Sequence, residues 1–145
     1  MDTPPRASDL LATPVRTDAD VLARIGAIID AEARAAPALW LFFLGHDGLQ
    51  NNVVVPVDDI PEFPDPRLVS NVCYIVTRVL AETPGGSAVI TLSRSGPADR
   101  GEPDREWLRA LQDGAATHQT PIRMLCLATP SGVLELGPVR ATPGT

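Results

Sequence analysis

The sequence predicts one α/β domain, with a single mixed β-sheet of about five strands flanked by three helices. The chain has 145 residues, of which 44% are hydrophobic and 21% charged, a balance that can bury one core. Apolar runs of strand length alternate with stretches in which apolar residues recur three and four positions apart. The 15 prolines fall mainly between these segments, where proline is tolerated. The expected order is helix, strand, strand, helix, strand, helix, strand, strand.

The first helix is expected to begin after Thr17. Thr17 and Asp20 have the three-residue spacing of a capping box, with Asp in place of Glu. Apolar residues then recur at helical spacing to about Ala35, and Pro37 ends the segment. These signals predict a helix of about five turns over residues 17–35.

Two strands are expected to follow this helix. Residues 39–44 form a continuous apolar and aromatic run, which is typical of a strand covered on both faces near the centre of a sheet. Residues 53–57 read as a returning strand, and Pro56 within it favours an edge or a bulge.

The second half of the chain contributes the remaining elements. A broad apolar stripe over residues 68–80 predicts an amphipathic helix, and a strand is expected at 88–92. A helix is expected from Pro103 to about Thr117, followed by strands at 122–128 and 133–136. Because strand–helix–strand crossovers usually join parallel neighbours, the sheet should be mixed. Residues 1–16 and 137–145, rich in Pro, Thr and Gly, are expected to flank the 17–136 domain as flexible segments.

Composition excludes several chemistries. The 12 basic residues are all arginine, so Schiff-base catalysis, a phosphate-loop lysine and a lysine base are ruled out. Arginine without lysine, together with many prolines, is typical of a GC-rich bacterial genome. A net charge of −6 argues against non-specific nucleic-acid binding, which depends on neutralising phosphates.

A cytoplasmic location is expected. The N-terminal residues carry acids and prolines where a secretory signal has a basic flank and an apolar run. The longest apolar stretch, residues 38–44, is far shorter than the roughly 20 residues of a membrane span. Cys73 and Cys126 lie in apolar stretches and are expected to be reduced core residues, although a disulfide between them is an open alternative.

The most informative segment for function runs from Ser93 into the helix expected at Pro103. It leaves the carboxyl end of a strand expected to be parallel and enters a helix, which is where ligands bind in open α/β sheets. Arg94 and Arg100 could clamp a carboxylate or an acidic patch of a partner. The alternative is a salt-bridged surface loop, because acids in the segment match its arginines. The candidate ligand- or partner-binding residues are Ser93, Arg94, Ser95, Asp99, Arg100 and Glu106.

Other polar features favour structural interpretations. His46 lies in an expected turn and His118 at a helix end, and neither has the spacing of a metal ligand. The acidic loop over residues 58–65 matches no calcium-binding pattern, and is interpreted as a stiff connection that packs Phe63 against the core. We therefore expect no metal, no cofactor and no catalytic residue from these features.

The element order and three segments resemble the domain of the DNA repair protein RadC and its relatives in the JAMM metallopeptidase group. Residues 38–44 with Asp47-Gly48 resemble the opening strand and turn of that family, and residues 88–92 resemble the strand before its metal motif. Residues 122–127 with Ser131-Gly132 resemble its closing hairpin. The resemblance spans residues 36–136 and implies the family's fold.

The resemblance also implies where a zinc site would lie, and this sequence departs from it there. The family places a His-x-His at the end of that strand, followed by a serine and an aspartate ligand. Those positions carry Ser93-Arg94-Ser95, Pro103 and Glu106 here. One carboxylate cannot replace the three protein ligands of a catalytic zinc, so the family's hydrolase mechanism is not expected.

Three functional hypotheses follow from the sequence. The first is a non-catalytic binding or regulatory module on a metal-free RadC/JAMM-like fold, with a protein partner or self-association and without nucleic-acid or membrane binding. The second is a metal-independent enzyme or small-molecule-binding protein that uses the 93–106 loop, with Arg94 as a clamp and Asp99 or Glu106 as a base. The third is a subunit of a larger assembly. It predicts exposed apolar surface near Trp40, Phe42, Phe43 or Phe63.

Overall fold

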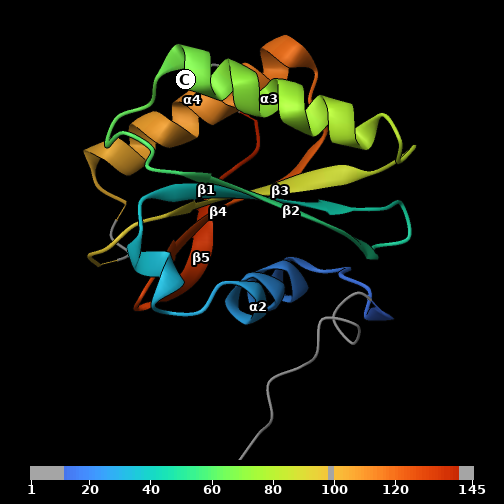
Figure 1. The fold of residues 1–145 in the computed structure, drawn as a ribbon, viewed down its shortest axis with the longest axis horizontal. Coiled ribbons are helices and arrows are strands. Elements are labelled where there is room, and N and C mark those ends of the chain that lie inside the picture. The colour runs from blue at the N-terminus through green and yellow to red at the C-terminus, as the bar shows by residue number, and fades with distance from the viewer. Residues whose placement is uncertain (1–11, 98–99, 141–145) are drawn as a thin grey trace, which may run out of the picture.

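The computed structural model describes residues 12–97 and 100–140, and within them it confirms the predicted α/β class. Three α-helices flank one mixed sheet of five strands in the order β2-β1-β3-β4-β5. Helices α3 (Pro66–Leu80) and α4 (Glu102–His118) lie on one face of the sheet, and α2 (Asp18–Ile28) lies on the other, as Figure 1 shows. The molecule therefore has three layers, with the sheet in the middle.

The strands occupy the expected segments but are slightly longer. They are β1 (Ala38–Leu44), β2 (Gln50–Asp58), β3 (Ser87–Ser93), β4 (Ile122–Thr129) and β5 (Gly132–Gly137). β3 and β4 are parallel neighbours joined through α4, and every other pair in the sheet is antiparallel. β2 is an edge strand, as Pro56 indicated, since a proline cannot donate to a second neighbouring strand.

One of the two expected crossovers does not join neighbours. β2 and β3, the strands on either side of α3, are separated by β1, which pairs antiparallel with both. The position of β1 follows from its composition, because a strand that is apolar on both faces must be covered on both. β1 is therefore an interior strand, while the central position of the sheet belongs to β3.

Helix α2 is shorter than predicted. Its capping box is present: the Asp20 main-chain N–H donates to Thr17 Oγ1 at 3.1 Å, and the Thr17 N–H donates to Asp20 Oδ2 at 3.0 Å. The helix nevertheless ends at Ile28, because Ile29 has an extended backbone, and only a short 3₁₀ turn follows at Ala33–Ala35. The Arg34 Nε–H donates to the Ile29 carbonyl at 2.8 Å and so satisfies an acceptor that a longer helix would have used.

Two hydrophobic clusters fill the spaces between the layers. Alternate residues of β1 point to opposite faces, so Leu39 and Phe43 pack under α3 and α4 while Phe42 packs against the α2 side. Cys73 lies in the first cluster and Cys126 in the second, and both are free thiols. The sheet separates them, so a disulfide between them is not formed. Burial raises the pKa of both thiols, that of Cys126 to about 12.

The packed unit extends slightly beyond the expected boundaries at both ends. Val15 is buried, and its N–H donates to the Gly48 carbonyl at 2.7 Å, so packing begins before residue 17. Gly137 belongs to β5, and the Gln112 side-chain amide donates to the Pro138 carbonyl at 2.7 Å. Residues 1–11 and 141–145 of the two segments expected to be flexible lie outside the described residues.

Two of the four aromatic side chains expected near exposed surface are fully buried. Phe42 and Phe43 have no solvent exposure, because β1 is covered on both faces. Trp40 is half-buried, and Phe63 is exposed. In the described part of the chain, no helix has the length and apolar character needed to cross a membrane.

Candidate functional site

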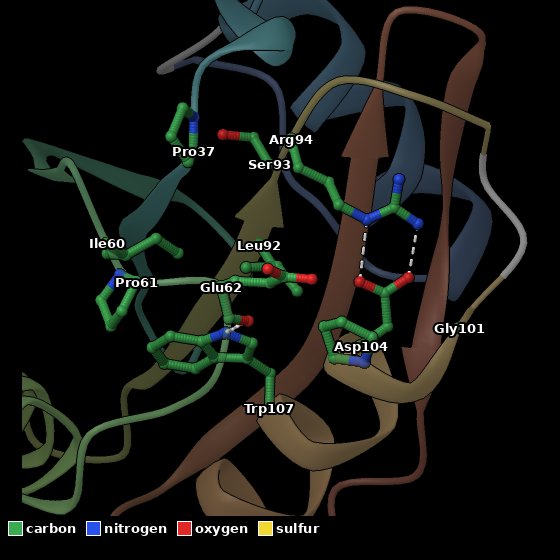
Figure 2. A pocket seen from close by; sticks show the side chains of 11 residues that line it. Pro37, Ile60, Pro61, Glu62, Leu92, Ser93, Arg94, Gly101, Asp104 and Trp107 are labelled. Carbon is green, nitrogen blue, oxygen red and sulfur yellow. Dashed lines mark hydrogen bonds and ion pairs between the residues drawn. The ribbon is translucent and has the colours of Figure 1, made fainter.

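A cavity of about 440 Å³ lies at the carboxyl end of β3. Four described segments form it: the residue before β1, the loop after β2, the end of β3, and the start of α4. Figure 2 shows their side chains around the space. Its apolar surface comes from Ile60, Leu92 and Trp107, with Pro37, Pro61 and Pro103 beside them. The cavity lies at the strand end where the sequence places its candidate ligand-binding segment, residues 93–106.

Ser93, the first candidate residue, lines the cavity but has a structural role. Its side chain is completely buried, and its Oγ–H donates to the Ala36 carbonyl at 2.8 Å. The Trp40 indole N–H donates to the same Oγ at 2.9 Å. The hydroxyl therefore ties the end of β3 to the segment before β1, and it has no adjacent base that would make it a nucleophile.

Arg94 binds the carboxylate of Asp104 within the protein, although it was a candidate for binding the carboxylate of a ligand. Its Nε donates to Asp104 Oδ1 at 2.8 Å, and its Nη2 donates to Asp104 Oδ2, which gives the two-bond geometry of a strong guanidinium–carboxylate pair. Its Nη1 donates to the main-chain carbonyls of Ser95 and Pro97, each at 2.9 Å. The Asp104 side chain is 2% exposed, so the pair fastens the loop after β3 to the first turn of α4. The expected clamp for a ligand carboxylate is therefore occupied by Asp104.

Three of the remaining candidate residues, Ser95, Arg100 and Glu106, do not line the cavity. Ser95 and Arg100 are exposed, and Arg100 has a positive φ of 48°. Glu106 projects from the surface of α4. Its Oε1 atom lies 3.8 Å from Nη1 of Arg109, one helical turn away. Asp99 lies outside the described residues. Of the five candidates that the structure describes, Ser93 and Arg94 line the cavity.

Two residues that define the site, Glu62 and Trp107, were not among the candidates taken from the sequence. Trp107 is 1% exposed and was expected only as part of the buried face of its helix. Its indole N–H donates to the Glu62 main-chain carbonyl at 2.9 Å. Figure 2 shows the Glu62 side chain extending into the cavity on the side that faces Asp104. A buried tryptophan needs an acceptor for its indole N–H, so the sequence could have indicated that Trp107 binds a polar group. It could not identify the Glu62 carbonyl as that group.

The prediction that the acidic loop, residues 58–65, packs Phe63 against the core is wrong. Phe63 is 47% exposed, while Ile60, three positions earlier, is buried in the core under α3 and α4. The bond from Trp107 to Glu62 fixes the loop so that Ile60 points inward. The loop therefore contributes both an apolar wall and a carboxylate to the cavity.

The charges around the cavity are unequal. Among the residues that the structure describes, Glu62, Asp104 and Arg94 are the ionisable residues that line it, so carboxylates outnumber cations there. Asp104 and Arg94 are bound to each other, whereas the Glu62 carboxylate makes no hydrogen bond or ion pair with any residue that the structure describes. The unpaired charge at this cavity is negative.

The residues at the positions of the RadC and JAMM zinc ligands do not fit that metal. At the two histidine positions of the His-x-His motif, the Ser93 hydroxyl is committed to Ala36 and Trp40, and Ser95 is exposed. Pro103 has no side-chain atom that could bind a metal, and Glu106 lies on the outer surface of α4. His118 is the last residue of α4, and its Nε2 atom lies 3.4 Å from Ser70 Oγ. His46 lies in the turn after β1. Within residues 12–97 and 100–140, no three His, Cys, Asp or Glu side chains are grouped to hold a metal.

Comparisons of this chain with protein-family models, with curated proteins and with solved structures found no match.

Proposed function

We propose that this chain is a non-catalytic binding module whose ligand occupies the cavity at the carboxyl end of β3. The observation that carries the proposal is the cavity itself, at about 440 Å³ within the range of roughly 300–1,000 Å³ typical of small-molecule sites. Its lining is mostly apolar with a few polar groups, which is the usual composition of such sites.

The side chains at the cavity favour binding over catalysis. An acyl- or group-transfer site needs a nucleophile with an adjacent base. Ser93 supplies the one side-chain hydroxyl among the described lining residues, and it donates to a main-chain carbonyl. Two of the roles expected for the enzyme hypothesis are filled otherwise, since Arg94 binds Asp104 and Glu106 faces Arg109 on the surface, while Asp99 lies outside the described residues. What remains is a rigid apolar space with one unpaired carboxylate, which can hold a ligand.

The proposal includes a metal-free relationship to the RadC and JAMM group and a cytoplasmic location. The resemblance in element order supports the first, and the buried free thiols support the second. A protein partner or self-association is also proposed, with exposed Phe63 and Tyr74 as apolar contacts. Light scattering of the purified chain at several concentrations tests self-association.

A ligand-observed NMR screen with a matched pair of variants tests the binding function. The library should contain cationic, neutral and anionic fragments of one or two rings. Pro61→Trp adds bulk at the edge of the cavity, whereas Pro64→Trp makes the same change in the same loop at a residue that does not line it. We expect fragments that bind the wild-type chain to lose binding in P61W and to keep it in P64W. A library without a binder, or binders unaffected by P61W, would overturn the proposed function.

A further inference from the structure

We infer that the cavity selects a small organic cation, with an apolar body against Ile60, Leu92 and Trp107 and an ammonium group paired with Glu62. This inference rests on the proposed function, and it names the chemical class of the ligand. It follows from three features of the lining: the unpaired carboxylate, the committed guanidinium, and the size of the apolar space.

The Glu62 carboxylate is available to a ligand because the protein holds its main chain and not its side chain. The Trp107 indole N–H binds the Glu62 carbonyl at 2.9 Å, which places the residue at the cavity. The side chain itself extends into the space, as Figure 2 shows, and makes no hydrogen bond or ion pair with the described residues. A carboxylate beside an apolar surface offers a pairing position to a cation.

The guanidinium of Arg94 does not make the cavity selective for anions. Its Nε and Nη2 hold Asp104, and its Nη1 holds the carbonyls of Ser95 and Pro97. An anionic ligand would have to displace the buried Asp104 carboxylate, and it would also meet the negative charge of Glu62. Anions are therefore disfavoured even though an arginine lines the cavity.

The apolar lining and the volume define the rest of the ligand. A cavity of about 440 Å³ is near the small end of ligand sites, so it suits one compact ring or branched chain better than an extended peptide. Ile60, Leu92 and Trp107 are buried residues that offer only apolar atoms to that group, apart from an indole N–H already bound to Glu62. The fitting ligand is a small amine with an aromatic or aliphatic body.

Three probes of nearly equal shape separate charge selection from cavity binding. Benzylammonium, benzyl alcohol and benzoate differ chiefly in charge, and NMR titration of the Trp107 indole N–H signal gives a dissociation constant for each. We expect wild-type protein to bind benzylammonium about fivefold more tightly than benzyl alcohol, as for a solvent-exposed ion pair, and benzoate most weakly. Added salt should reduce the preference.

The variants Glu62→Gln and Glu82→Gln complete the test. Glu62 is exposed, so E62Q should fold, and it should bind benzylammonium and benzyl alcohol equally. E82Q makes the same change at an exposed glutamate outside the cavity and should keep the wild-type preference. Equal binding of the amine and the alcohol by wild-type protein, or an unchanged preference in E62Q, would overturn the cation selection and leave the binding function standing. Failure of all three probes to move the Trp107 signal would count against the cavity as a ligand site, and therefore against both proposals.

Discussion

The indole nitrogen of Trp107 donates a hydrogen bond to the main-chain carbonyl of Glu62 at 2.9 Å, joining residues 45 positions apart in the sequence. Trp107 lies in the second turn of α4, and Glu62 lies in the loop between β2 and α3. This bond fixes the loop over the cavity, and it leaves the Glu62 carboxylate available to a ligand.

Trp107→Phe tests whether this bond positions Glu62. The variant keeps an aromatic ring but loses the N–H donor and part of the buried ring, so we expect the free energy of unfolding to fall by about 1–3 kcal/mol. Benzylammonium should also bind more weakly, because the loop is no longer fixed. Trp40→Phe is the control, since it removes the indole bond to Ser93 Oγ from a tryptophan that does not line the cavity. Equal effects of both variants on binding would contradict a positioning role for Trp107.

The Arg94–Asp104 pair should behave as one unit in a double-mutant cycle. Arg94→Ala leaves the 2%-exposed Asp104 carboxylate without its cation, and Asp104→Ala removes the carboxylate that accepts two hydrogen bonds from the guanidinium. Each single variant should lose about 2–3 kcal/mol of stability, somewhat below the cost for a fully buried pair because Arg94 is 25% exposed. The double variant should lose about 1–3 kcal/mol less than the sum of the singles. Urea unfolding of the four proteins measures this, and strict additivity would show that the two residues are not coupled.

Two helical glycines should respond to alanine with opposite signs. A Cβ on Gly26 in α2 would lie 3.8 Å from Arg34 Nη2, an ordinary van der Waals contact, so Gly26→Ala should stabilise the chain by about 0.5–1 kcal/mol. A Cβ on Gly114 in α4 would lie 2.8 Å from Val69 Cγ1 and 3.2 Å from Cys73 Sγ, both on α3. Gly114→Ala should therefore destabilise the chain by about 1–3 kcal/mol, because α3 and α4 would have to separate. Thermal unfolding distinguishes the signs, and a stabilising G114A would show that this close approach is not required.

The capping box of α2 predicts a pH-dependent contribution to stability. Hydrogen bonds from the Arg16 and Thr17 main-chain N–H groups lower the pKa of Asp20 below its ordinary value of 3.8. A lowered pKa means that the ionised carboxylate stabilises the fold above pH 3.8, and that this stabilisation is lost as the pH falls through the folded-state pKa.

Asp20→Asn should therefore be less stable than the wild type at neutral pH, and the difference should shrink as the pH falls below 3.8. Urea unfolding at a series of pH values measures the difference. Thr17→Ser keeps the hydroxyl of the box and should retain the wild-type pH dependence. A difference between D20N and wild type that stays constant down to the acid limit would show that the Asp20 carboxylate contributes no charge-dependent stability.

The elements of the fold were predictable because their signals are local. The Thr17–Asp20 box, the apolar run of β1 and the stripe of α3 each depend on residues within one element, and each appears in the structure. Pairing of strands depends on longer distances, so the placement of β1 between β2 and β3 was not foreseen.

The cavity was only partly predictable, for a related reason. The sequence indicated the end of β3 as a candidate site, because ligands bind at the carboxyl ends of strands in open α/β sheets. Its charge pattern also indicated that the arginines of the 93–106 loop could pair with nearby acids. It could not choose Asp104 from the several acids near Arg94, because that choice depends on where the first turn of α4 packs. Glu62 was missed because its approach depends on a bond to Trp107, which no local pattern encodes.

The most direct test of the central claim is where a bound cation perturbs the protein. The chain has two tryptophans, and only Trp107 lines the cavity, so their indole N–H signals in a ¹⁵N-labelled sample report on binding at this site and away from it. Titration with benzylammonium should move the Trp107 signal and the amide signals of Ile60 and Glu62 with one dissociation constant, and should leave the exposed face of α3 unchanged. Shifts confined to α3, or the absence of any shift at Trp107, would contradict the assignment of the cavity as the ligand site.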